Sequence, residues 1–242
     1  MAESVAGEKK GGLTFAPEAG SQRMRDIINK NVTEEDLDRA AKAAFEAGWN
    51  RMKLYFMMGL PTETLEDIKG IADTAQQVVD LYYSMEHPKG KGVQVTISVA
   101  CFVPKPFTPY QWAPLCNVRT LKKRFKILGD GLKKEKRIKL ITESLKETVV
   151  QSVLARGSRR IGEALLKAHV EGRSLKQVLK EEGLDAEELA ERELQVGQPL
   201  PWQHLDMGVT QEYLAAELQR SESGKFTPMC FDGCRRCGVC RE

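Results

Sequence analysis

The sequence predicts an α/β fold in which a parallel β-α-β-α-β unit precedes a mainly helical C-terminal region and a cysteine-rich tail. The first observation is a pair of apolar runs of strand length, 52–58 and 93–103, separated by a long helical pattern. Connections of this length join parallel neighbours through right-handed crossovers. The second observation is a change in the residue pattern after Val103, from alternating strands and helices to mainly helical segments. The third is that four of the six cysteines lie in the last thirteen residues.

The first elements follow a polar, glycine-rich lead-in of residues 1–12. The apolar run Leu13–Pro17 is short enough for a strand, and a helical stretch follows over 21–30. A second helix begins at Thr33, because this residue is followed by three acids, the pattern of a capped helix N-terminus. Gly48 is expected to end it.

The central elements are a strand, a helix and a strand. Residues 52–58 are almost continuously apolar, which is typical of a strand buried on both faces. A long helix is expected from about Thr62, and its apolar stripe is formed by Leu65, Ile68, Ile71, Ala72, Ala75, Val78 and Val79. After a loop at 87–91, the run 93–103 predicts a third strand. One face of that strand carries Val93, Val95, Ile97, Val99, Cys101 and Val103.

The second half begins with a proline-rich loop over 104–109 that is interleaved with aromatic residues. A lysine-rich helix follows over 122–139, and 138–142 predicts one more strand. Most of 145–220 has helical character, with breaks near Gly157, Gly172, Gly183 and Pro199–Pro201. The predicted domains are the lead-in 1–12, an α/β part 13–117, a mainly helical domain 118–222 and a metal-binding tail 223–242.

The composition is that of an ordinary globular protein. The chain of 242 residues is 41% hydrophobic and 29% charged, and its 37 basic and 34 acidic residues leave a net charge of +3. This balance does not favour an obligate nucleic-acid binder. No apolar run approaches the roughly 20 residues of a membrane helix, and the first residues lack the apolar core of a signal peptide. We therefore expect a cytoplasmic protein that makes no membrane contact.

The tail carries the pattern Cys-x3-Cys-x2-Cys-x2-Cys, formed by Cys230, Cys234, Cys237 and Cys240. Such short spacings let four thiolates reach one metal centre, and four sulfurs suit a 4Fe–4S cluster or zinc. The pattern is similar to the compact ferredoxin run read in reverse, whereas zinc sites more often use two Cys-x2-Cys pairs separated by a longer loop. Disulfides or free thiols are the third alternative.

Several stretches resemble the radical SAM superfamily. LTFAPEAGSQRMRDIINKNVTEEDL and RMKLYFMMGLPTETLEDI are similar to the fourth and fifth strand regions of its barrel, and VTISVACFVPKPFTPYQW is similar to the sixth. SVLARGSRRIG, LPWQHLDMGV and CFDGCRRCGVC resemble an uncharacterised subgroup whose members often carry a cobalamin-binding-like domain. The resemblance covers about residues 11–240. It implies that 13–117 is the C-terminal half of a TIM-like radical SAM barrel.

The resemblance also implies a site for S-adenosylmethionine (SAM) at the carboxyl ends of the strands. It places Glu18 and Ser21 near the ribose or amino-acid part of SAM, and Arg23 against its carboxylate. It assigns the adenine contacts to Met57, Gly59, Pro61, Glu63 and Val103. Glu63 lies one position later than the acidic residue in the commonest form of this motif.

Each of these assignments has a structural alternative. Glu18 and Glu63 are also suited to the N-termini of the helices that follow them. Met57 and Met58 are residues that more often belong to a core than to a cofactor site. The lysine-rich helix has the character of a solvated face, and an RNA-binding patch is the alternative. The three histidines are isolated, and none is assigned to a metal.

The cysteine pattern limits the expected activity. Cys230, Cys234 and Cys237 have the Cys-x3-Cys-x2-Cys spacing of radical SAM enzymes, but that motif belongs in the loop after the first barrel strand. In addition, Cys240 would occupy the fourth iron site, which SAM must reach. Cys101 and Cys116 cannot form a three-cysteine motif. We therefore expect the C-terminal part of a larger radical SAM enzyme, inactive alone, which works with an N-terminal half or a separate partner protein. The alternative is a non-catalytic zinc-knuckle module that binds RNA or a protein.

Overall fold

The computed structural model describes residues 11–87 and 92–240, and it divides the chain into two compact units. The first unit is Met1–Ala100 with Arg119–Glu143, and the second is Cys101–Val118 with Ser144–Glu242. Most of the loop predicted at 87–91 lies outside the described residues. The two units are considered separately.

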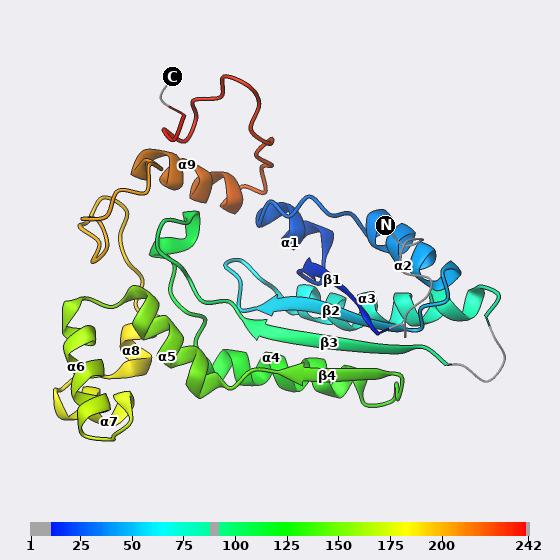
Figure 1. Ribbon diagram of the computed structural model, residues 1–242, viewed down its shortest axis with the longest axis horizontal. Coiled ribbons are helices and arrows are strands. Elements are labelled where there is room, and N and C mark those ends of the chain that lie inside the picture. The colour runs from blue at the N-terminus through cyan, green and yellow to red at the C-terminus, as the bar shows by residue number, and fades with distance from the viewer. Residues whose placement is uncertain (1–10, 88–91, 241–242) are drawn as a thin grey trace. The chain divides into compact units, whose positions relative to one another are not determined.

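The first unit contains a four-stranded parallel sheet (Figure 1). The strands are β1 (Leu13–Glu18), β2 (Arg51–Met58), β3 (Gln94–Cys101) and β4 (Ile138–Thr142), and they lie in the order β1-β2-β3-β4. The register sets Leu13 opposite Met52 and Val95 opposite Ile138. The α/β class predicted from the sequence is confirmed, and the additional strand expected at 138–142 is β4. This arrangement is consistent with a partial TIM-like radical SAM fold.

The helices of this unit are α1 (Gln22–Ile27), α2 (Glu34–Glu46), α3 (Leu65–Ser84) and most of α4 (Val118–Leu132). Capping boxes open α2 and α3, as the sequence indicated for α2, and the rings of Phe45 and Tyr82 pack edge to face between these two helices. The lysine-rich helix ends at Leu132 rather than at 139, because the chain turns there to enter β4.

Two predictions for the central elements are wrong in detail. The helix expected from Thr62 begins at Leu65, because Thr62 has φ +63°, outside the helical region. Leu65 is 52% exposed and does not belong to the buried stripe. The strand 52–58 is not buried on both faces. Its even-numbered residues are at most 2% exposed, but Tyr55 is 38% exposed because the packing of the described chain covers only one side of this strand.

The predicted face of β3 is confirmed for Val95, Ile97, Val99 and Cys101, which are all buried. Val93 and Val103 are also buried, but they lie outside the strand, which is shorter than the predicted run 93–103.

The second unit is mainly helical. It contains the 3-10 helix η2 (Pro109–Trp112) and the helices α5 (Leu145–Arg156), α6 (Arg159–Val170), α7 (Leu175–Glu181), α8 (Ala186–Glu191) and α9 (Gln211–Glu222). The predicted breaks fall between these helices: Gly157 caps α5, and Gly172 and Gly183 have positive φ.

Two apolar clusters hold the second unit together. One is built from α5, α6, α7 and α8 with Val103, Leu115 and Val118. The other gathers Trp112, Leu200, Trp202 and Leu214, and beside it the indole of Trp202 donates a hydrogen bond to Gln111 at 2.9 Å. Within the described ranges, no helix combines the length and apolarity that crossing a membrane requires.

Candidate functional site

The loop that follows β1 carries the first group of candidate residues. Glu18, the last residue of β1, has φ +68°, and its carboxylate lies 3.3 Å from Nζ of Lys30. A non-glycine residue in the left-handed region is uncommon and is worth functional attention. Ser21 caps α1 by accepting a hydrogen bond from the amide of Met24. Glu18 therefore pairs with Lys30 and precedes the helix cap, which is Ser21.

Two glycines bring this loop against α3. A Cβ on Gly20 would collide with the backbone of Asp67 and Ile71, and a Cβ on Gly70 would collide with the carbonyl of Gly20. The hydroxyl of Thr74 donates to this carbonyl at 3.5 Å. The absence of both side chains thus allows backbone-to-backbone contact, which sets the β1–α1 loop beside the start of α3.

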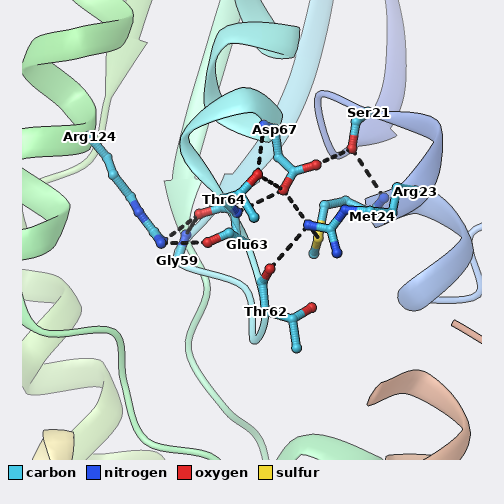
Figure 2. A network of polar contacts seen from close by, with 9 residues as sticks. All are labelled: Ser21, Arg23, Met24, Gly59, Thr62, Glu63, Thr64, Asp67 and Arg124. Atoms are coloured by element: carbon cyan, nitrogen blue, oxygen red, sulfur yellow. Dashed lines mark hydrogen bonds and ion pairs between the residues drawn. The ribbon is translucent and has the colours of Figure 1, made fainter. Parts of the chain in front are cut away.

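Asp67 is the centre of a polar network between these elements (Figure 2). Its carboxylate accepts hydrogen bonds from the hydroxyl of Ser21, the guanidinium of Arg23, and both the amide and the hydroxyl of Thr64. Burial alone would raise the pKa of Asp67, but the hydrogen bonds from Arg23, Ser21 and Thr64 outweigh this effect and lower it to about 2. Asp67 is therefore ionised at neutral pH.

Arg23 is held by this network but keeps part of its guanidinium available. Its Nη2 contacts Asp67, the carbonyl of Thr62 at 3.1 Å and the sulfur of Met24 at 3.2 Å. Its Nε and Nη1 donate to none of the described residues, and the side chain is 47% exposed. An arginine fixed on one side and open on the other can bind a carboxylate.

The turn after β2 carries the second group. The amide of Gly59 donates to Oε2 of Glu63 at 2.7 Å (Figure 2). Arg124, from α4, donates to the same oxygen and to the backbone carbonyl of Glu63, both at 2.7 Å. The side chain of Glu63 is 3% exposed. Burial raises the pKa of Glu63 to about 7, although the Gly59 amide and Arg124 act in the opposite direction.

The structure brings the two groups of predicted residues together. Ser21 and Arg23 reach Asp67, which is four residues beyond Glu63, so the turns after β1 and β2 lie side by side. Met57 is half-buried, whereas its neighbour Met58 is fully buried in the core. Val103 is placed differently, since it belongs to the apolar cluster of the second unit.

Three residues whose side chains make ionic or capping contacts in this network are absent from the sequence-based site: Thr64, Asp67 and Arg124. A signal for two of them exists, because Thr64-x-x-Asp67 is a helix-capping pattern. Arg124 carries no such signal, since it is one of many basic residues on α4, 61 residues away from its partner Glu63.

The cysteine tail shows a thiolate-favouring contact but no assembled metal centre. Nε of Arg236 donates to Sγ of Cys234 at 3.2 Å, and this hydrogen bond lowers the pKa of the Cys234 thiol. A lowered thiol pKa fits a metal ligand. However, the described residues contain no group of three or more potential metal-ligating side chains at one point. All four tail cysteines are free, and the metal site remains a prediction.

Comparisons with known proteins support the resemblance seen in the sequence. Residues 2–75 match the family model of the radical SAM superfamily, which confirms this resemblance for the part of the chain that contains β1, β2 and the intervening helices. An uncharacterized protein of Methanocaldococcus jannaschii is 36% identical over 153 residues, which are 63% of this chain and 32% of that protein. The chain thus spans about a third of the length of the curated relative it matches. No solved structure matches it.

Proposed function

We propose that this chain is the SAM-binding C-terminal part of a radical SAM enzyme and that it does not cleave SAM alone. The observation that carries the proposal is the coincidence of two findings. The superfamily match covers residues 2–75, and the polar network of Ser21, Arg23, Glu63 and Asp67 lies in this same segment. It also lies where ligands bind in parallel α/β folds, beyond the carboxyl ends of the strands.

The candidate residues are suited to different parts of the SAM molecule. Arg23, with two nitrogens that meet no described acceptor, is suited to the carboxylate of SAM. Glu18 and Ser21 end the same strand and are suited to the ribose or the amino group. Met57 at the end of β2, together with Gly59 and Pro61 in the turn after it, is suited to contact adenine. Glu63 maintains the shape of this turn through its hydrogen bond from the amide of Gly59. The family resemblance also implies an adenine contact at Val103, which in the structure belongs to the apolar cluster of the second unit.

The radical chemistry itself requires a reduced 4Fe–4S cluster bound next to SAM, which supplies the electron for reductive cleavage. The only Cys-x3-Cys-x2-Cys spacing in the 242 residues is in the tail, where Cys240 supplies a fourth thiolate. A cluster with four protein ligands has no open iron for SAM. The tail is accordingly proposed as an auxiliary 4Fe–4S site, or a zinc site, and Arg236 would favour the thiolate of Cys234.

The sheet suggests how a further segment would join. β1 is at one edge of the described sheet, and it pairs with β2 on one side only. An edge strand of this kind accepts another strand through its backbone groups. The proposed partner is therefore the N-terminal half of the barrel, either on the same polypeptide or on a separate protein.

Anaerobic reconstitution with iron and sulfide tests the proposal. We expect a brown protein with about four irons per chain, and no 5′-deoxyadenosine when SAM and dithionite are added. Cys234→Ser should abolish iron uptake, whereas Cys116→Ser, outside the tail pattern, should not. Formation of 5′-deoxyadenosine by the chain alone would refute the proposed inactivity. One tightly bound zinc without iron uptake would instead favour the non-catalytic zinc-knuckle module.

A further inference from the structure

The corner between α5 and α6 in the second unit is built around one glycine. A Cβ on Gly157 would lie 2.5 Å from Cγ1 of Ile161 and 2.6 Å from the carbonyl oxygen of Val153, so a side chain there requires a backbone shift. Glycine allows the end of α5 to meet the start of α6 closely. Ser158 is the N-cap of α6, but its side chain accepts none of the first amides of the helix. The amide of Ile161 donates to the carbonyl of Ser158 at 2.9 Å, whereas the amides of Arg159 and Arg160 have no partner inside the helix.

A cavity of about 190 Å³ opens at this corner. For comparison, an apolar cavity of about 150 Å³ holds a benzene molecule. One part of the lining is polar and basic, formed by Arg156, Ser158, Arg160 and Arg192. The other part is apolar, formed by Val153, Ile161, Leu184, Leu189 and Pro201.

The positive charge at the cavity is not neutralised within the described part of the chain. Arg156, Arg160 and Arg192 form no ion pair with any described acidic residue, and the first turn of α6 contains no acid. A cluster of guanidinium groups at a helix N-terminus is electrostatically unfavourable unless an anion balances it.

Arg156 provides independent evidence. It is 5% exposed, and its two terminal nitrogens donate to the carbonyls of Ala190 at 2.7 Å and Arg192 at 2.8 Å. Its Nε is buried and meets no hydrogen-bond acceptor among the described residues. Burial, together with the charge of Arg192, lowers the pKa of Arg156 to about 10. The buried guanidinium of Arg156 thus adds a positive charge that no described carboxylate pairs with, and this charge favours an anion in the cavity.

We propose that this cavity binds a small organic anion, with its phosphate or similar oxyanion group at the start of α6 and its apolar body on the opposite wall. The amides of the α6 N-terminus and the side chains of Arg160 and Arg192 would hold the oxyanion, because guanidinium groups and helix N-termini are the usual partners of phosphate. Leu184, Leu189 and Pro201 would contact the apolar part.

The lining favours a small molecule over a nucleic acid. A polynucleotide backbone is recognised by an extended basic surface, whereas this cavity is about the size of one ring and is apolar on one side. The site lies entirely within the second unit, so it does not depend on the proposed SAM site.

Phenyl phosphate is a suitable probe, because it combines an oxyanion with an apolar ring. We expect saturable binding of phenyl phosphate to the full chain by calorimetry, tighter than binding of inorganic phosphate. Arg160→Ala should weaken it at least about tenfold, as expected for a charge-assisted contact. Arg159→Ala is the matched control: this neighbour is also exposed on the same turn but does not line the cavity, and loss of its side chain should leave binding unchanged.

Circular dichroism of each variant separates loss of binding from loss of fold, and Arg192→Ala provides a second lining variant at an exposed position. The proposal is overturned if wild type shows no saturable binding, or if Arg159→Ala and Arg160→Ala weaken binding equally. It is also overturned if single-stranded RNA binds the chain and this binding depends on Arg159 as much as on Arg160, which would indicate a general basic surface.

Discussion

The buried carboxylate of Glu63 makes a prediction about pH dependence. Its side chain is 3% exposed and accepts hydrogen bonds from Gly59 and Arg124. Burial raises its pKa from 4.5 to about 7. Between pH 4.5 and about 7, the carboxyl group of Glu63 is protonated in the folded state but ionised in the unfolded state. The contribution of Glu63 to stability is therefore fully present below pH 4.5 and is lost as the pH rises through 7.

The size of this effect follows from the shift. One pKa unit corresponds to about 1.4 kcal/mol, so protonation of Glu63 stabilises the first unit by about 2 to 3 kcal/mol at pH 5 and by almost nothing at pH 8. Glu63→Gln retains an oxygen acceptor for Gly59 but does not titrate. The stability of wild type relative to this variant should therefore fall by about 2 to 3 kcal/mol from pH 5 to pH 8.

Hydrogen exchange of the β2 amides measures this difference in the first unit itself, once the intrinsic exchange rates at each pH are corrected. Glu66→Gln is the matched control, because Glu66 is in the same segment but its side chain is 79% exposed and paired with Lys69. It should show no comparable pH dependence. If Glu63→Gln and Glu66→Gln change the opening free energy of β2 equally at both pH values, the pKa of Glu63 is not raised by burial.

Three further substitutions test the packing. Gly20→Ala should destabilise the first unit by about 1 to 3 kcal/mol in urea unfolding, because its Cβ collides with backbone. Gly12→Ala should not, since the nearest atoms to its Cβ belong to Arg51 and lie at an ordinary contact distance of 3.7 Å. Gly157→Ala should destabilise the second unit similarly. Gly162→Ala in α6 should be neutral or stabilising, because its Cβ would meet no atom within 4 Å. Equal effects of these two substitutions would contradict the steric explanation. Asp67→Asn should cost about 2 kcal/mol at pH 7 and progressively less as the pH falls from 3.8 through about 2, since the ionised form is the stabilised one; a loss independent of pH would contradict this.

The elements of the fold were largely predictable because their signals are local. The capping residues Thr33 and Gly157, together with the alternation of residues 93–103, depend on short stretches of sequence, and the structure agrees with each of them. The exposure of Tyr55 was not predictable in this way. An apolar run does not reveal whether both faces of a strand are covered, because burial depends on which other elements pack against it.

The candidate site was predictable only in part, for a similar reason. Ser21, Arg23 and Glu63 carry a family resemblance in their own segments. Arg124 acts on Glu63 from a helix 61 residues away, and only the folded chain shows that contact. The tail cysteines illustrate the reverse: their spacing is evident in the sequence, but the described residues form no group of three or more metal-ligating side chains.

Equilibrium dialysis with labelled SAM measures whether the purified chain binds SAM. We expect weak but saturable binding. Arg23→Lys should weaken it about tenfold, because lysine keeps the charge beside Asp67 but loses the planar geometry for a carboxylate. Arg39→Lys, an exposed arginine whose partner is Asp36, should have no effect. Absence of saturable binding, or an equal response to the two substitutions, would show that Arg23 and its neighbours do not form a SAM site.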